Sequence, residues 1–112
     1  MFTTDGSVGM CSAVSTTFSD AATAERIADE LVNGRLAACG QVTPITSVYR
    51  WKGEVRRETE MLLRLKTAPG RAKELVAALR KLHPYELPEI VIEPLEVTPD
   101  YAKWVAEATA DG

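Results

Sequence analysis

The residues with the clearest capacity for chemistry lie in the segment LHPYELPE, residues 82–89. It contains His83, the one histidine of the chain, together with Tyr85, Glu86 and Glu89. An imidazole beside carboxylates could ligate a metal ion or make a polar contact with a ligand in a cleft. A catalytic base would need an orienting partner and a nucleophile. The sequence identifies neither, so no catalytic residue is predicted.

A structural role for His83 is the alternative. Pro84 ends a helix that reaches it, and the residue before a proline is disfavoured in helical geometry. His83 would then cap the end of a helix, where a protonated imidazole suits the negative end of the helix dipole. The sequence leaves ligand contact and helix capping both open.

A second group of candidates lies on or beside a predicted hairpin. Aromatic and charged side chains in this group could be paired across strands and packed in an interface. They could instead line a small-molecule or anion pocket where subunits meet, with the rings as walls and Lys66 as the charge. With the first segment, the pocket candidates are Tyr49, Trp51, Glu60, Lys66, His83, Tyr85 and Glu89.

The two cysteines, Cys11 and Cys39, do not form a disulfide framework, and their spacing matches no zinc or redox motif. Cys39 stands in the apolar stretch LAAC and is predicted to be a core residue. Cys11 follows Met10 like the start of a soft-metal MxCxxC loop, but the second cysteine position is Val14. Metal binding at Cys11 is therefore not expected.

Composition limits the class of protein. A chain of 112 residues with 46% apolar and 26% charged residues has the size and core of one domain. The net charge of −3 and the scattered Lys and Arg argue against a nucleic-acid partner. Neither a signal peptide nor an apolar run long enough for a membrane span is evident. We expect a cytoplasmic protein with reduced thiols, and a flexible segment over residues 1–8.

Hydrophobic periodicity and turn signals predict the elements that must position these residues. Helical spacing covers residues 20–33, which Gly34 ends, and the segment from Pro69 to Pro84. Extended patterns predict strands at residues 9–17, 36–51, 54–67 and 89–97. The second strand should bend or bulge at Pro44, and Lys52-Gly53 should form a tight turn.

A last, short helix should begin at Thr98-Pro99-Asp100 and pack through Tyr101 and Trp104. The element order is β-α-β-β-α-β plus this helix. It predicts the α+β class and a ferredoxin-like split βαβ sandwich, with two helices on one face of an antiparallel sheet. The other face must be covered or polar, and an outward Leu62 favours a covered one. We therefore expect an oligomer in which hairpins and edge strands pair between subunits.

Several motifs resemble the CutA family of divalent-cation tolerance proteins. LAAC, YRWKG, LKT and HPYELPE occur in this order, and the likeness runs from about Val14 to Val105. The resemblance implies a single CutA-like domain over residues 1–112 and a homotrimer similar to PII-type signalling proteins. It also implies a role in tolerance of copper and other divalent metals, without enzymatic activity.

The resemblance also identifies copper-ligand positions. The family's site uses a cysteine at the end of the first strand and two adjacent histidines at the end of the second helix. These positions are Ser15, Leu82 and His83 here, so only His83 matches. Copper prefers thiolate and imidazole, which leaves the cofactor open between none, copper and another divalent cation. The alternative function is a PII-like small-molecule sensor or signalling scaffold, with ligand pockets at subunit interfaces.

Overall fold

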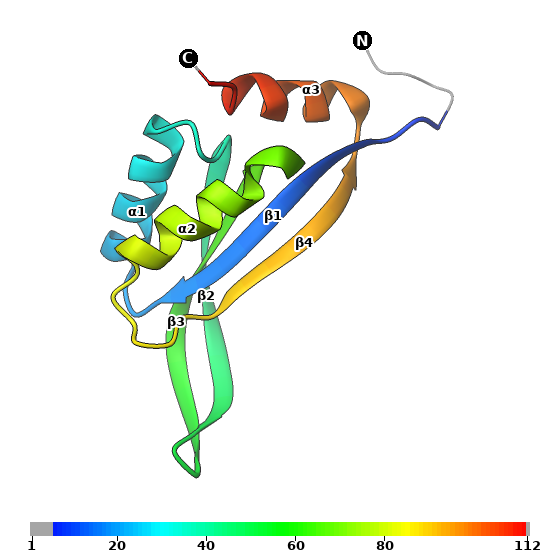
Figure 1. The fold of residues 1–112 in the computed structure, drawn as a ribbon. Helices are drawn as coiled ribbons and strands as arrows, with labels where there is room; N and C mark the ends of the chain where they lie inside the picture. Colours follow the sequence, from blue (N-terminus) through cyan, green and yellow to red (C-terminus); the bar gives the residue numbers. More distant parts are fainter. Residues whose placement is uncertain (1–5, 112) are drawn as a thin grey trace.

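The computed structural model describes residues 6–111, which form a four-stranded sheet with three α-helices (Figure 1). Of the segment predicted to be flexible, residues 1–5 lie outside the described residues, and residues 6–8 precede the first strand. The elements in chain order are β1 (Gly9–Phe18), α1 (Ala21–Asn33), β2 (Cys39–Trp51), β3 (Glu54–Thr67), a 3₁₀ turn (Pro69–Arg71), α2 (Ala72–Leu82), β4 (Ile90–Val97) and α3 (Pro99–Ala108).

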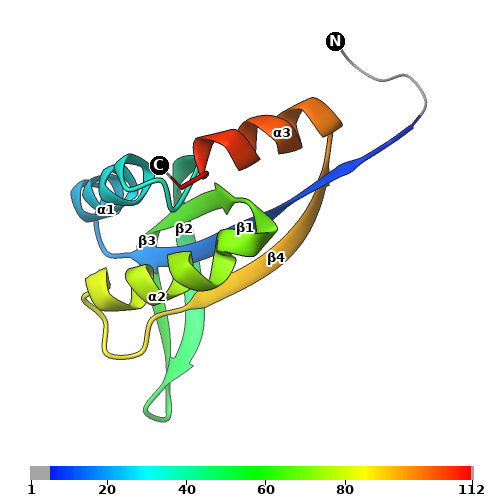
Figure 2. The same ribbon diagram turned by 45° about the horizontal axis from the view of Figure 1, so that its top comes forward.

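The sheet has the strand order β2-β3-β1-β4, and every neighbouring pair is antiparallel. α1 and α2 lie on the same face of the sheet, while the β2–β3 hairpin extends well beyond them (Figures 1 and 2). This arrangement confirms the predicted ferredoxin-like split βαβ fold. It leaves β2 and β4 as the two edge strands. No described helix is long and apolar enough to span a membrane.

The core lies between the sheet and the first two helices. Its members are fully or almost fully buried and come from both layers: Val14, Phe18, Ala24, Ile27, Leu31, Ala37, Leu63, Leu65, Leu75 and Leu79. Leu63 and Leu65 alternate with residues on the opposite side of β3, as the sequence predicted. Burying one such leucine stabilises the fold by about 1.5–3 kcal/mol.

α3 packs against the opposite face of the sheet, near the start of β1. Val105 is buried beside Cys11, which is also fully buried. Cys39, predicted to be a core residue, is only partly buried, because it lies at the start of the edge strand β2 with its Sγ 3.8 Å from the Tyr101 hydroxyl. Trp104, predicted to pack with Tyr101, has its ring 5.6 Å from the Tyr101 ring between centroids but remains 45% exposed. Its neighbour Val105 takes the buried position, and adjacent residues on a helix face different directions.

Three local details of the backbone refine the sequence expectations. Pro44 pairs opposite Met61 without interrupting the β2–β3 register, because proline is tolerated on an edge strand. α1 ends at Asn33 as expected, but Gly34 has φ −79° and the left-handed residue is Arg35, with φ 61°. β2 begins at Cys39, since the amides of residues 36 and 37 both donate to the carbonyl of Leu31.

Candidate functional site

A pocket of about 660 Å³ lies between the β2–β3 hairpin, the end of β1 and the segment 83–89. Small-molecule sites generally occupy about 300–1,000 Å³. Its lining combines aromatic rings with an excess of carboxylates: Thr17, Ser19, Ser47, Val48, Tyr49, Trp51, Arg56, Glu58, Glu60, Tyr85, Glu86, Leu87 and Glu89. The size and the mixed lining make it the candidate functional site.

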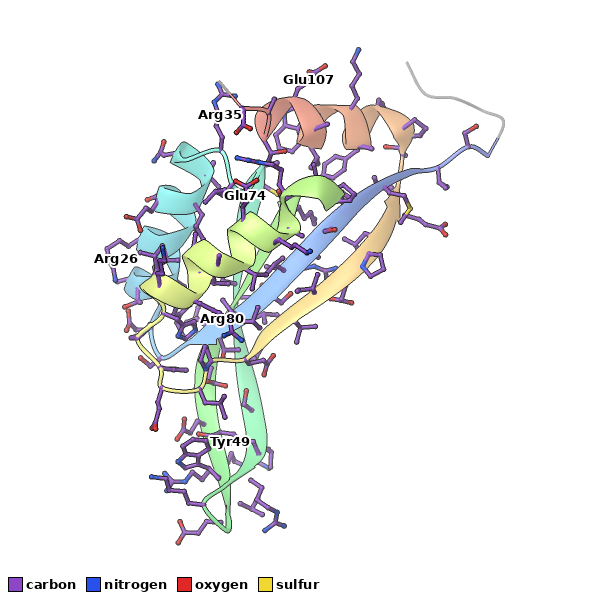
Figure 3. The ribbon with its side chains drawn as sticks, viewed as in Figure 1. Arg26, Arg35, Tyr49, Glu74, Arg80 and Glu107 are labelled. Carbon is purple, nitrogen blue, oxygen red and sulfur yellow. The ribbon has the colours of Figure 1, made fainter. Side chains whose placement is uncertain are left out.

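One wall of the pocket is a face of the hairpin. In the register, Tyr49 is opposite Arg56 and Ser47 is opposite Glu58. Side chains of directly paired residues share a face, and every second residue along each strand returns to that face. Trp51 and Glu60 therefore lie on the same side as these four residues. Figure 3 shows Tyr49 on the hairpin, away from the helices.

The other wall is the segment between α2 and β4, which His83 holds in place. His83 is the C-cap of α2, and its amide donates to the Leu79 carbonyl at 2.9 Å. Its Nδ1 accepts a hydrogen bond from the Tyr85 amide at 3.1 Å. The rings of His83 and Tyr85 lie 4.8 Å apart between centroids. His83 therefore positions Tyr85 from behind and does not itself line the pocket.

The imidazole of His83 is also fixed on its other side. Nε2 lies 2.9 Å from the Thr17 carbonyl and 3.0 Å from the Thr16 hydroxyl. The ring stacks on Phe18 at a centroid distance of 4.4 Å. Since Nδ1 accepts a backbone N–H, the proton of the neutral ring belongs on Nε2, where it donates to the Thr17 carbonyl. Both ring nitrogens are thus engaged within the chain.

Burial lowers the pKa of His83, and the hydrogen bond to Thr17 offsets this only in part. The structure places His83 at the predicted cap position, and its lowered pKa disfavours the protonated form that would suit the helix dipole. Burial removes the imidazolium from water, which opposes protonation even at the negative end of a helix. A proton on Nδ1 would also face the Tyr85 N–H, and two donors would then oppose one another.

The pocket is electrostatically negative. Its lining contains Glu58, Glu60, Glu86 and Glu89, against Arg56 as its one cationic side chain. Burial raises the pKa of Tyr49, and so do the hydrogen bond to Glu58 and the charges of Glu58 and Glu60. Burial likewise raises the pKa of Tyr85, followed by the charge of Glu60.

Lys66 does not supply the charge of this pocket. It shares a face of β3 with Glu60, but six residues along a strand correspond to about 20 Å. Its Nζ donates to the Gln41 side chain at 3.1 Å and lies 5.9 Å from the centre of the Tyr101 ring. Within the subunit, the candidate pocket is therefore acidic and not the anion site considered from the sequence.

Five of the seven pocket candidates line this one pocket, namely Tyr49, Trp51, Glu60, Tyr85 and Glu89. Sequence reasoning missed Arg56 and Glu58. Every second residue of a strand lies on the same face, so counting back from Glu60 in steps of two along the predicted strand would have found both.

The three copper-ligand positions do not converge within the single chain. Val14 packs in the helix-side core and Thr16 contacts His83, so strand alternation directs Ser15 to the opposite face. Leu82 packs against the helix-side core. Within residues 6–111, no three His, Cys, Asp or Glu side chains are grouped so that they could hold a metal ion.

A family model described as "CutA1 divalent ion tolerance protein" matches residues 12–108. A relative from Thermus thermophilus, named divalent-cation tolerance protein CutA, is 44% identical over 88 residues, which cover 77% of this chain and 85% of the relative. A CutA homolog from Xenopus laevis is 42% identical over 101 residues, covering 88% of this chain and 67% of the relative. The chain spans 58% of the mouse relative and 61% of the zebrafish relative.

Solved structures agree with these matches. CutA from Synechococcus elongatus PCC7942 superposes with a TM-score of 0.87 at 33% identity, covering 94% of this chain and 97% of that one. A protein described as PII-like protein CutA, from Nostoc sp. PCC 7120, superposes with a TM-score of 0.80 at 35% identity. It covers 88% of this chain and 97% of that one.

Proposed function

We propose a role in divalent-cation tolerance, since the chain belongs to the CutA1 divalent ion tolerance family. The match of the family model over residues 12–108 is the observation that carries this proposal. Copper is the first cation to test. In this proposal, the protein works as a homotrimer in the cytoplasm and catalyses no reaction.

Exposed apolar residues and free sheet edges support the proposed assembly. β2 and β4 are edge strands, and unpaired strand edges readily pair with another chain. Val48 and Val55 on the hairpin are 57% and 65% exposed, and Ile92 on β4 is also exposed. Pairing of a hairpin with a neighbouring edge would cover these side chains.

In this proposal, any tightly held copper is bound between subunits. The positions Ser15 and Leu82 supply no copper ligand, and both nitrogens of His83 already have partners inside the subunit. A site between subunits could combine carboxylates from more than one chain, which would suit harder divalent cations better than Cu(I).

Native mass spectrometry of the chain with and without Cu(II) tests this role. The expected result is a mass of three chains that gains a fixed number of copper ions. The matched control is His83→Gln. Its side-chain oxygen can still accept a hydrogen bond from the Tyr85 amide, so this variant should retain the trimer. A trimer that binds no cation stoichiometrically would contradict direct binding, and a monomer would contradict the assembly.

The second candidate function is a small-molecule sensor of the PII-like type. The acidic, aromatic-lined pocket is the observation that favours it. Thermal unfolding with and without candidate ligands tests it, because a ligand that binds only the folded chain raises the melting temperature. A pocket variant should lose that shift while keeping the fold.

A further inference from the structure

We propose that the pocket binds a small organic cation, a molecule with one or more ammonium groups on an aliphatic or aromatic body. This inference rests on the proposed sensor function and names its ligand class. It is carried by three features of the pocket: its charge, its aromatic walls and its dimensions relative to a bare ion.

The charge of the pocket selects a cation. Glu58 and Glu60 come from β3, while Glu86 and Glu89 come from the segment before β4. Arg56 is the one positive side chain of the lining, and its Nη2 lies 3.7 Å from a carboxylate oxygen of Glu54. An anionic ligand would meet the carboxylates of both walls, whereas an ammonium group can approach either wall.

The aromatic rings select a cation that has an apolar body. Tyr49, Trp51 and Tyr85 line the pocket, and the faces of such rings attract ammonium groups within about 6 Å. The chain itself shows this attraction, because the Lys52 ammonium lies 5.7 Å from the centre of the Trp51 ring. The same rings offer apolar surface to the carbon skeleton of a ligand.

The dimensions disfavour a bare metal ion. A bound divalent ion needs several oxygen or nitrogen ligands that converge at about 2.0–2.6 Å. Within the described chain, no three acidic, histidine or cysteine side chains are grouped in that way. A pocket of about 660 Å³ instead has room for a molecule with several carbon atoms.

The two acidic pairs stand on separate elements. One pair is fixed by the hairpin register, since Glu58 is opposite Ser47 and Glu60 is opposite Ile45. The other pair follows Tyr85, whose amide is bound by His83. A linear diamine can therefore place one ammonium group near each pair, with its methylene chain between the rings.

The test uses three five-carbon probes: cadaverine, the uncharged pentanediol and the dianion glutarate. Binding is followed by the fluorescence of Trp51 in the full chain carrying Trp104→Phe, which leaves Trp51 as the one indole. Cadaverine should give a saturable change that weakens with added NaCl. Pentanediol and glutarate should give none at the same concentrations.

The double variant Glu58→Gln/Glu60→Gln should bind cadaverine at least about tenfold more weakly, because it removes both negative charges of the hairpin wall while keeping side chains of nearly the same shape. Glu107→Gln is the matched control. Glu107 is exposed on α3, at the opposite end of the molecule from Tyr49 (Figure 3), and its removal should leave the affinity unchanged.

Three results would overturn the proposal: no binding of cadaverine to the folded chain, equal binding of pentanediol, or unchanged affinity in the double variant. Preferred binding of glutarate would reverse the sign of the site and would also overturn it. The copper measurement is independent of all four results. A role in divalent-cation tolerance can therefore stand when the organic-cation proposal fails, and the reverse also holds.

Discussion

The helix-covered half of the sheet and the projecting hairpin use similar residue types in opposite ways. Under α1 and α2, Leu63 and Leu79 are completely buried, and His83 has a partner for each ring nitrogen. On the hairpin, Val48 and Val55 are more than half exposed. One half is complete within a single chain, and the other presents apolar and acidic surface that is available to another molecule.

This contrast separates the residues that hold the fold from those that make contacts outside it. His83 belongs to the first group although its residue type suggested the second. It joins the end of α2 to the end of β1, since its backbone amide donates to the Leu79 carbonyl and its ring Nε2 donates to the Thr17 carbonyl. Tyr49 and Trp51 belong to the second group, because they line an open pocket on the hairpin.

Truncation of one leucine and one valine tests the contrast directly. Leu79→Ala should lower the free energy of unfolding by about 2–5 kcal/mol, since it leaves a cavity in the core. At a chain concentration too low for the proposed trimer, Val55→Ala should lower it by less than about 0.5 kcal/mol, the range for exposed positions. Urea unfolding of both variants at equal chain concentration measures the difference. A loss at Val55 as large as that at Leu79 would show the hairpin to be buried in an assembly.

Replacement of Trp51 asks whether the hairpin carries that assembly. Trp51→Ala should weaken association by about 2 kcal/mol or roughly thirtyfold, the effect of losing an aromatic anchor at an interface. Sedimentation at low micromolar concentration would detect this change. The control is Trp104→Ala, which removes the indole of α3 and leaves the hairpin intact. A trimer that is unchanged in Trp51→Ala would transfer the interface to another surface.

The pH dependence of stability follows from the environment of His83. Its pKa is lowered in the folded chain, so the unfolded chain binds the proton more tightly. The stabilisation is fully present above the unfolded pKa of about 6.5 and is lost as the pH falls through the lower folded pKa. Urea unfolding between about pH 8 and pH 5 should show this loss. In His83→Gln the slope should be smaller, and an equal slope would assign it to other groups.

The sequence was sufficient for the fold because local signals and packing agree. Leu63 and Leu65 alternate as a strand with one covered face, and Pro84 ends α2 where the pattern predicted. The turn at Lys52-Gly53 also forms as predicted, with both residues at positive φ. These features depend on residues close together in the chain, which sequence periodicity reports well.

The site was only partly predictable because it depends on distances that periodicity does not give. Alternation places Lys66 on the same face as Glu60, but it does not reveal that only one of them reaches the pocket. The second wall exists because the segment after His83 crosses the end of β1, and that contact joins residues more than sixty positions apart. The lowered pKa of His83 could not be read from the sequence for the same reason, since the ring is buried against Phe18.

The smallest expected effect concerns the two non-glycine residues at positive φ among the described residues, one in each half of the molecule. Arg35, with φ 61°, follows α1, and Lys52, with φ 50°, lies at the hairpin tip. A side chain in this region costs about 1–2 kcal/mol, and glycine costs about 0.5–1 kcal/mol in lost chain entropy. Arg35→Gly should therefore raise the free energy of unfolding by about 0.5 kcal/mol.

The hydrogen bond from Arg71 Nη2, at 3.3 Å, survives the change to glycine, because its acceptor is the backbone carbonyl of residue 35. Arg35→Ala is the control, because it removes the guanidinium but keeps the Cβ that causes the strain. Lys52→Gly should raise the free energy of unfolding by less, because it also removes the ammonium beside the Trp51 ring. Urea unfolding of the three variants measures these differences. A larger gain in the free energy of unfolding for Lys52→Gly than for Arg35→Gly would mean that backbone strain destabilises the hairpin turn more than the turn after α1.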